Sequence, residues 1–554
     1  MTTLLADISP LRTALLCAVP LGYALAALAV GSLARTPQAG WRLARGAAAL
    51  AGAAALLSLG WLLVQGPGLM RGPALLLPGD GPAVHISLHS DALAGTMLLL
   101  VSFIGWVIVG YSQPYLDGER GQPRYIRCLM LTLAAVSLLV LTNNLLVLAL
   151  AWVATSLALH GLLTFFDQRP QALIAAHKKF LASRVADLFL LGGIALLVIT
   201  LGTLEIDQAM AVAQALPQPP AALQAAALLI AASALLKCAQ LPVHGWLIQV
   251  MEAPTPVSAL LHAGVVNLGG FLLIRLGTLV ADVPAAQALL VVVGSTTAVV
   301  AALVMMTRIS IKVSLAWSTC AQMGFMLMQC GLGLHDLALL HLVAHSLYKA
   351  YAFLAAGAAV EQNRLRQMAP PVAAVGAGRW LLGGLVGMAL VCTATLVWGL
   401  KPAEAPALWA VGLVLALAMA PLLSVSTLRA GGLWPLAGLA GAGALALVYF
   451  GLHVALSHWL GLASVGGSPA PVLVVWVCVS FAALFVVQGA VRAWPQGRLA
   501  RGLYPWLFAG MYLDELFTRL TFRLWPARLP AARDRAATPA TPATPAARAP
   551  GALS

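Results

Sequence analysis

Long apolar stretches recur along the chain from residue 12 to residue 491, and short polar or Gly/Pro-rich segments separate them. A helix needs about 20 mostly apolar residues to cross a bilayer, and most stretches have about that length. The sequence lacks the alternation of polar and apolar residues that is typical of an outer-membrane barrel. The pattern predicts an all-α polytopic membrane protein of about fifteen transmembrane helices, at 12–33, 47–65, 92–111, 128–142, 145–166, 180–202, 221–247, 257–279, 285–306, 312–331, 337–360, 378–398, 405–426, 434–456 and 471–491.

Three segments depart from this pattern. Residues 66–91 are rich in Gly and Pro, which predicts an outside loop or a small hairpin. Residues 502–530 combine aromatic side chains with arginines, which favours an amphipathic interfacial segment at the inner surface. Residues 531–554 are Ala/Thr/Pro repeats and predict a disordered tail. The transmembrane part then divides into N-terminal helices with the outside loop, a core, and C-terminal helices, at 1–127, 128–426 and 427–501.

Composition supports a membrane protein and explains the positive charge. Charged residues make up 9% of the chain, whereas a soluble domain carries roughly 25%. The net charge is +14, but the basic residues are dispersed between apolar stretches and are not gathered on one domain. This dispersal argues against a nucleic-acid partner. It indicates membrane topology, because cytoplasmic loops collect Lys and Arg.

The basic residues also predict the orientation in the bilayer. With the N-terminus outside and the C-terminus in the cytoplasm, nearly all basic loop residues lie inside, namely Arg35, Arg42, Arg45, Arg120, Arg124, Arg127, Arg169, Lys178, Lys179, Arg184, Arg308, Lys312, Arg364, Arg366, Arg379, Arg429, Arg492, Arg498 and Arg501. The outside loops then hold Arg71 and Lys401 with the acids Asp80, Glu205, Asp207, Asp282 and Asp336. We expect a multi-pass protein of a bacterial inner membrane, whose first apolar stretch is retained as a helix.

Lys237 is the most informative ionisable residue, because it lies within the apolar stretch LLIAASALLKCAQLPVHGW. A charge inside the bilayer costs roughly 2.5–3.5 kcal/mol on insertion scales. Pro242 follows and must disrupt the helix, and freed backbone groups are tolerated at that depth only against protein or a water-filled cavity. The pattern predicts a protonatable lysine beside a hydrated helix break. The alternative is a lysine that snorkels from a helix end.

Two histidines follow the break, on either side of the segment EAPTPVSALL. His262 and the nearby Asn267 can continue a hydrogen-bonded chain of water molecules. His244 can do the same, or it can be an interfacial side chain. Glu252 is expected to be an exposed loop acid or to line an entrance to the path.

A second line of titratable groups occurs in HLVAHSLYKAYAF. His341, His345 and Lys349 are spaced i, i+4 and i+8, so one helix face presents all three. Histidine titrates near neutral pH, which suits proton relay. Two histidines at this spacing can also bind zinc, but Lys349 would repel a cation and no cysteine or carboxylate accompanies them. A pair of core histidines is the remaining alternative.

Other candidate residues carry weaker signals. His160 lies inside an apolar stretch, and Arg184 and Asp187 can pair on one helix face. Lys401 lies at the end of a predicted span, where snorkelling explains it equally well. The seven cysteines form no CxxC pair and are read as small core residues. The sequence contains no nucleotide-binding, haem-attachment or nucleophile motif, so we expect no cofactor, no metal and no enzymatic activity in this chain.

The residues around Lys237 carry a family resemblance. LLKCAQLPVHGWLIQVMEAPTPVSALLHAGVVNLGG resembles the most characteristic stretch of the antiporter-like subunits of respiratory complex I and of Mrp-type cation/proton antiporters. AAHKKFLASRVADLFLL, KVSLAWSTCAQMGFM and HLVAHSLYKAYAFLAAG resemble further segments of these proteins. The resemblance covers roughly residues 90–400 and is most specific over 230–365.

This resemblance implies an architecture and a charge pattern. The family has two inverted five-helix repeats, each with a broken helix that bears a central lysine. Lys237 corresponds to the first lysine, and Lys401 is a candidate for the second. The family also implies an acidic partner for the first lysine in a Trp-Glu pair, whereas this chain has Trp152-Val153. We also expect no counterpart of the long lateral helix of the complex I subunit after the last predicted span.

The segment MEAPTPVSALLHAGVVNLGG is most similar to the membrane subunits of DAB-type inorganic carbon accumulation systems. That resemblance implies a soluble partner, the DabA subunit, which resembles a zinc β-carbonic anhydrase. The leading hypothesis is therefore a proton-conducting membrane subunit, with Na⁺ as the alternative ion, that powers uptake of CO2 or bicarbonate. The other two hypotheses are an Mrp-like antiporter or respiratory subunit, and a membrane anchor that conducts nothing.

Overall fold

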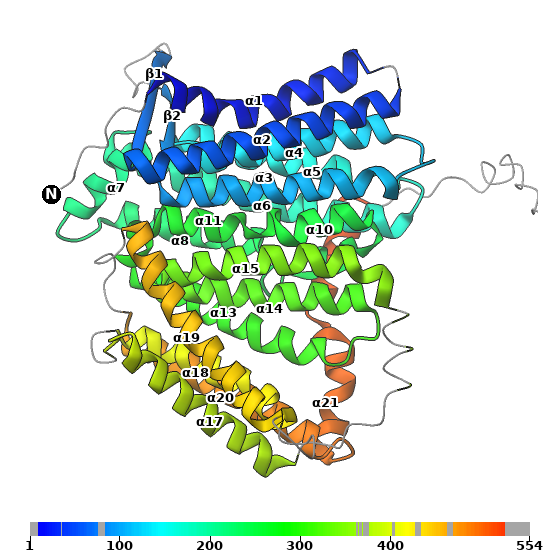
Figure 1. The fold of residues 1–554 in the computed structure, drawn as a ribbon, viewed down its shortest axis with the longest axis vertical. Coiled ribbons are helices and arrows are strands. Elements are labelled where there is room, and N and C mark those ends of the chain that lie inside the picture. The colour runs from blue at the N-terminus through cyan, green and yellow to red at the C-terminus, as the bar shows by residue number, and fades with distance from the viewer. Residues whose placement is uncertain are drawn as a thin grey trace, which may run out of the picture.

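The computed structural model describes residues 9–34, 36–75, 84–359, 376–401, 405–426, 434–461 and 469–526, with the single positions 361, 364 and 368. Apart from connecting segments, the described residues are helical except for one antiparallel hairpin, β1 (Gly68–Leu75) and β2 (Val84–Ser90). Long helices lie side by side, with the hairpin at one end of the bundle (Figure 1). The fold class predicted from the sequence is confirmed, and so is a hairpin within residues 66–91.

The N-terminal half contains α1 to α9. Their bounds are α1 (Pro10–Ser32), α2 (Pro37–Gln65), α3 (Ala92–Tyr115), α4 (Gln122–Leu141), α5 (Leu145–Leu163), α6 (Pro170–Leu201), α7 (Ile206–Ala215), α8 (Ala221–Lys237) and α9 (Gly245–Gln249). Local sequence explains several of the helix starts. Asp91 caps α3 and Asn144 caps α5 through side-chain acceptors for backbone N–H groups, and proline lies in the first turn of α1, α2 and α6.

The C-terminal half contains α10 (Thr255–Ala263), α11 (Leu268–Arg275), α12 (Gly277–Ala281), α13 (Pro284–Met305), α14 (Ile311–Gly331) and α15 (His335–Leu354). Four long helices follow, α17 (Ala377–Val397), α18 (Pro406–Ser426), α19 (Trp434–Leu460) and α20 (Pro471–Ala493), and then two short ones, α21 (Arg498–Phe508) and α22 (Glu515–Leu524). Helices α17 to α20 form a group that is tilted against the rest of the bundle (Figure 1). One apolar core extends through α1 to α15, and a smaller core joins α13 and α14 to α18 and α20.

Two ends of the bundle need names. The hairpin face is the end at which β1, β2 and α7 lie, and the strap face is the opposite end, at which α21 lies (Figure 1). The strap is the segment from Arg498 to Pro526, which contains α21 and α22. A single interfacial element was predicted at 502–530, whereas the structure has two helices, and α22 packs back on α6. Residues 527–530 and the predicted disordered tail lie outside the described residues.

Thirteen helices of the described residues are long and apolar enough to cross a membrane. The predicted number of about fifteen spans, which came from hydropathy and length, stays a prediction. Two predicted spans are interrupted: 221–247 contains the end of α8 and the start of α9, and 257–279 contains α10 and α11. Apolar composition continues through both interruptions, so hydropathy alone could not reveal them. The orientation and the division into domains stay predictions.

Several charges that were assigned to loops are buried. Lys178 and Lys179, predicted in an inside loop, lie in α6 and are enclosed by the bundle. Glu205 and Asp336, predicted in outside loops, are also buried. Glu205 accepts hydrogen bonds from Ser87 (2.6 Å) and Asn143 (2.7 Å) under the hairpin. The loop assignments of Lys178, Lys179 and Asp336 were wrong because positive-inside counting assumes that a charge near a span end reaches water. Glu205 does lie in the connection between α6 and α7, but the bundle encloses it.

Candidate functional site

Helix α8 ends at Lys237 itself, before the proline that predicted the break. Ala239 has a φ of 52°, in the left-handed region, and helical structure resumes only at Gly245. The residues between are tied to neighbouring helices: Cys238 Sγ donates to Val266 O (3.1 Å), and Leu241 N donates to Thr297 Oγ1 (3.2 Å). The predicted lysine at a helix break is therefore present, with the lysine as the last helical residue.

Lys237 has an acidic neighbour. Its side chain is buried, and its Nζ lies 4.0 Å from Asp187 Oδ1 on α6 and 4.3 Å from the centre of the Trp152 ring on α5. The other oxygen of Asp187 lies 2.7 Å from Arg184 Nη2. The family motif led us to expect a glutamate next to Trp152, where this chain has Val153. Asp187 on α6 is the acidic neighbour of Lys237 instead, and the Trp152-Val153 motif did not indicate it.

A second buried lysine continues this cluster toward the strap face. Lys179 Nζ donates to the carbonyl and to the hydroxyl of Ser156, both at 2.9 Å. Trp152, Ser156 and His160 follow one another at four-residue intervals on α5, so they lie on one helix face. The His160 ring lies 6.5 Å from the His177 ring, nearly parallel to it. Lys179 was not among the residues predicted for the path, although its place near the start of a long apolar helix was a usable signal.

His262, His345 and Lys349 meet in the centre of the bundle. His262 Nδ1 lies 3.1 Å from Thr319 Oγ1 on α14, and His345 Nε2 lies 3.2 Å from the carbonyl of His262. Lys349 Nζ donates to the carbonyl of Leu315 (3.0 Å), one turn before Thr319. Helices α10, α14 and α15 thus bring these predicted path residues together. The side chains of His262, His345 and Lys349 are all buried.

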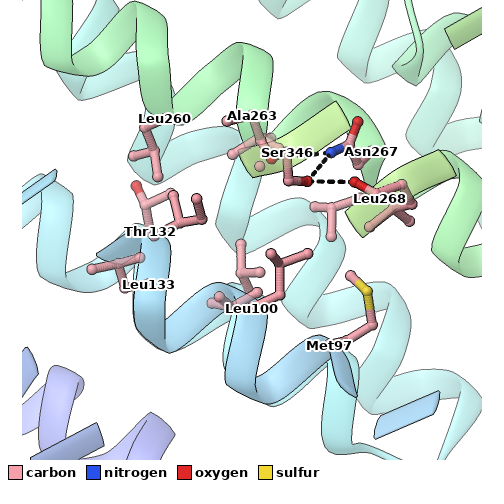
Figure 2. A pocket seen from close by; sticks show the side chains of 15 residues that line it. Met97, Leu100, Thr132, Leu133, Leu260, Ala263, Asn267, Leu268 and Ser346 are labelled. Carbon is pink, nitrogen blue, oxygen red and sulfur yellow. Dashed lines mark hydrogen bonds between the residues drawn. The ribbon is translucent and has the colours of Figure 1, made fainter. Parts of the chain in front are cut away.

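A small cavity lies beside this central cluster, between α3, α4, α10, α15 and the start of α11 (Figure 2). Its volume is about 30 Å³, and its walls are apolar apart from Thr132, Asn267 and Ser346. Asn267 Nδ2 donates to Ser346 Oγ (2.7 Å) and to Ala263 O (3.0 Å). A cavity of roughly 10–15 Å³ on this measure holds one water molecule. The site therefore has room for water next to a polar group, as a hydrated path requires.

His341 lies at the edge of the bundle, where α14 and α15 face the tilted helices. Its ring centre is 6.0 Å from that of His345. It lines two hollows of about 390 and 470 Å³, and Gln322 and Tyr449 line both as well. His453, one turn after Tyr449 on α19, pairs with the buried Asp336 at the hairpin-side end of α15. No sequence motif indicated this pair, because its members are more than a hundred residues apart.

The structure places the other candidates as follows. His244 is buried against the Trp317 ring (4.8 Å) and not at a lipid interface. Glu252 is largely exposed and lies 3.8 Å from Arg169, as a loop acid would. Lys401 is exposed and lies just beyond the end of α17. The described residues contain no group of three or more His, Cys, Asp or Glu side chains that could hold a metal ion.

Comparisons with known proteins agree on the type of protein. Residues 142–371 match the family described as NADH:quinone oxidoreductase/Mrp antiporter transmembrane region, and residues 78–126 match the N-terminal region of complex I chain 5. The chain is 44% identical over 441 residues to the probable inorganic carbon transporter subunit DabB of Hydrogenovibrio crunogenus, covering 78% of this chain and 82% of that protein. It is 39% identical to the probable subunit DabB2 of Halothiobacillus neapolitanus, covering 82% and 84%.

More distant relatives belong to respiratory and antiporter complexes. NADH-quinone oxidoreductase subunit L of Escherichia coli is 35% identical over 287 residues, covering 50% of this chain and 47% of that subunit. Among solved structures, the Mrp complex of Dietzia has a chain with a TM-score of 0.61 and 28% identity, covering 93% of this chain and 59% of that chain. The archaeal membrane-bound sulfane sulfur reductase, at 18% identity and a TM-score of 0.55, shares the fold.

Proposed function

This chain belongs to the family of DabB inorganic carbon transporter subunits, and we propose that it conducts protons across the membrane to power inorganic carbon uptake. Na⁺ is the alternative ion. The membrane potential can supply enough energy to drive uptake, because one charge that crosses 100 mV carries roughly 2.3 kcal/mol. The soluble partner would be a DabA-like subunit with a zinc carbonic-anhydrase-like site, in which any CO2 hydration would take place. This chain would act as a transport subunit and not as an enzyme.

One observation supports conduction above all: Lys237, Lys179 and Asp187 are buried together at a helix break. Isolated charges inside a membrane are costly and mark ion pathways or proton relays. A subunit that only anchored a soluble protein would gain nothing from them. An anchor would be expected to fill this position with apolar side chains, which are often neutral or stabilising relative to buried ion pairs.

The clusters suggest a route. Protons would pass between the strap face and Lys237 by way of His244, with His160 and Lys179 beside that route, and Asp187 and Arg184 would hold the counter-charge. From Lys237 they would cross the bundle through His262 and His345, near Lys349, and reach His341. The hollow beside His341 extends to Tyr449, next to the Asp336–His453 pair on the hairpin side. Under the predicted orientation the strap face is cytoplasmic.

A growth experiment tests this function. The chain is co-expressed with its soluble partner in a carbonic-anhydrase-deficient strain at ambient CO2. We expect growth with the wild-type pair, loss of growth with Lys237→Ala, and growth with Lys401→Ala, since the Lys401 side chain is exposed. Full rescue by Lys237→Ala, with the protein present in the membrane at the wild-type level, would show that this lysine has no such role.

A second candidate function is cation/proton antiport of the Mrp type. The Mrp chain of Dietzia supports it through a shared fold over 93% of this chain. Sodium-dependent proton efflux in vesicles that contain this chain, without any soluble partner, would favour antiport. Uptake that requires the soluble partner and is indifferent to Na⁺ would favour the proposed function.

A further inference from the structure

The strap crosses the strap face and is fixed to the bundle at several points (Figure 1). Near its start, Arg308 at the end of α13 donates to the carbonyls of Leu507 and Phe508. Near its end, the Trp525 ring stacks on the His177 ring at 3.9 Å with an angle of 7°. Between these points the strap lies over the start of α9, which is the strap-side end of the helix break.

Asp514 is the strap residue that contacts buried charge. Its Oδ2 accepts hydrogen bonds from Lys178 Nζ (2.6 Å) and from Gln249 Nε2 (3.2 Å). Lys178 is fully buried and also donates to Thr518 Oγ1 (2.8 Å). The second oxygen, Oδ1, is buried without a hydrogen-bond partner among the described residues. This oxygen is the Asp514 atom nearest to Gly245 at the start of α9, and a buried acceptor without a protein partner is costly.

The Asp514 carboxylate reaches the helix break directly. A Cβ atom added at Gly245 would collide with it, so glycine is required there for the strap to approach. His244, the residue before Gly245, is 1% exposed, so the Asp514 carboxylate packs one residue away from a buried imidazole. The carboxylate thus lies between solvent and the buried residue that begins α9, because the Asp514 side chain itself is 26% exposed.

The backbone before Asp514 is strained. Met511 and Tyr512 have φ values of 59° and 56°, and neither is glycine. Non-glycine residues rarely adopt this conformation, and strain of this kind persists where the surrounding contacts fix the chain for a purpose. Here the two residues turn the strap so that Asp514 points into the bundle. A strap that only covered the surface would not require this turn.

We propose that Asp514 is the proton inlet of the ion path on the strap face, held by Lys178 and passing protons to His244. This inference rests on the proposed function. The carboxylate takes a proton from a hydronium ion at the strap face and leaves water behind, the protonated acid gives that proton to the neutral imidazole of His244, and the carboxylate is restored. Lys178 keeps the carboxylate charged and in place between transfers. The C-terminal strap then contributes a residue to the path as well as covering the bundle.

The test measures proton flux into proteoliposomes that contain the full complex, over a range of pH. Asp514→Asn keeps the size and the hydrogen-bond acceptor but cannot carry a proton, so we expect at least about a tenfold loss of flux. The remaining flux should fall in proportion to proton concentration as the pH rises, while the wild-type profile stays flatter. Asp514→Glu should recover much of the flux. Glu515→Gln is the matched control, because Glu515 is exposed and pairs only with Arg519 on the strap among the described contacts.

If Asp514 only fixed the strap to the bundle, the variants would show a different pattern of flux. Asp514→Asn leaves the buried Lys178 without a counter-ion, which could loosen the strap or prevent folding. The double variant Asp514→Asn with Lys178→Met removes both charges and keeps the packing. We expect its flux to stay low, with the titration profile of the single variant. Wild-type flux in the double variant, or an unchanged pH profile in Asp514→Asn, would show that Asp514 is not the proton inlet.

Lys237→Ala, measured in the same vesicles, separates this inference from the proposed function. If wild-type vesicles take up no more protons than protein-free vesicles, the proposed function fails, and if Lys237→Ala conducts like the wild type, the route through Lys237 fails. If Lys237→Ala does not conduct but Asp514→Asn conducts normally at every pH, the inlet fails and the proposed function stands.

Discussion

Asp187 lies between two cations: one carboxylate oxygen is 4.0 Å from Lys237 Nζ, and the other is 2.7 Å from Arg184 Nη2. Arg184 is partly exposed and stays charged, whereas Lys237 is enclosed and can gain or lose a proton. When Lys237 is protonated, the carboxylate is attracted toward α8. When Lys237 is neutral, the carboxylate is free to turn fully toward Arg184. Under the proposed function, this shared carboxylate would give the lysine two states with different surroundings.

Removing this carboxylate should stop conduction. Asp187→Asn leaves Lys237 and Arg184 near each other without a counter-ion, so the charged state of Lys237 becomes unfavourable. We expect at least about a tenfold loss of proton flux. Asp187→Glu keeps the charge on a longer side chain and should retain partial flux. Stopped-flow measurement with a pH dye in proteoliposomes gives the rates, and wild-type flux in Asp187→Asn would disprove the shared role.

Lys179 allows a test of whether this buried lysine takes part in proton conduction or only in packing. Lys179→Met has nearly the same volume and removes a buried charge, which is often neutral or stabilising for folding. We expect normal levels in the membrane and unchanged thermal stability, with clearly reduced flux. The matched control is Lys312→Met, because Lys312 donates to Thr255 away from this cluster. If Lys179→Met conducts normally, Lys179 is a structural residue and the route bypasses it.

The central histidines should carry protons and not zinc. His345 lies against the backbone carbonyl of His262, and neither side chain has a carboxylate partner in the described contacts. His345→Gln should lower flux, while added zinc should not restore or raise it. Elemental analysis of the purified chain should find far less than one zinc per molecule. Stoichiometric zinc that disappears in His345→Gln would instead support a metal site at His341 and His345.

The hairpin predicts how stability depends on pH. His89 on β2 is buried next to Asp91 and Arg275, and burial, followed by the charge of Arg275, lowers the pKa of His89 to about 4. In the unfolded chain a histidine titrates at about 6.5. The folded state thus binds fewer protons between these values, so the stability contribution is complete above about pH 6.5 and is lost as the pH falls toward 4.

A melting experiment checks this sign. The detergent-solubilised protein should melt at a lower temperature at pH 5 than at pH 7.5. His89→Gln, which cannot be protonated, should reduce that difference. His85→Gln on the same strand is the control, because His85 is less buried and its ring contacts a backbone carbonyl of β1. An equal pH dependence in His89→Gln and in the wild type would rule out His89 as its source.

The main features of this protein follow from its sequence because membrane insertion constrains composition strongly. The lengths of the apolar stretches revealed most of the long helices. Lys237 was identified because a charged residue inside an apolar stretch is costly in a membrane. The Gly/Pro-rich segment at 66–91 indicated the hairpin. Helical spacing placed His341, His345 and Lys349 on one face, as α15 has them.

Contacts between segments far apart in the chain could not be predicted from the sequence. The Asp187–Lys237 pair joins two helices fifty residues apart, and the motif at Trp152 pointed to a missing acid and away from Asp187. Lys178 looked like a loop cation because its partner, Asp514, lies 336 residues later in the strap. Such pairs follow from packing, which hydropathy and local spacing do not encode. The roles of the path residues therefore remain predictions until flux is measured.

The central claim is that protons cross this subunit by way of Lys237. The most direct measurement is potential-driven proton uptake into proteoliposomes that contain the chain with its soluble partner, with Lys237→Ala in parallel and with Na⁺ replaced by a large organic cation. We predict uptake by the wild-type complex that does not need Na⁺ and that falls to the level of protein-free vesicles in Lys237→Ala. Equal uptake by the wild type and Lys237→Ala, or wild-type uptake no greater than that of empty vesicles, would contradict the claim.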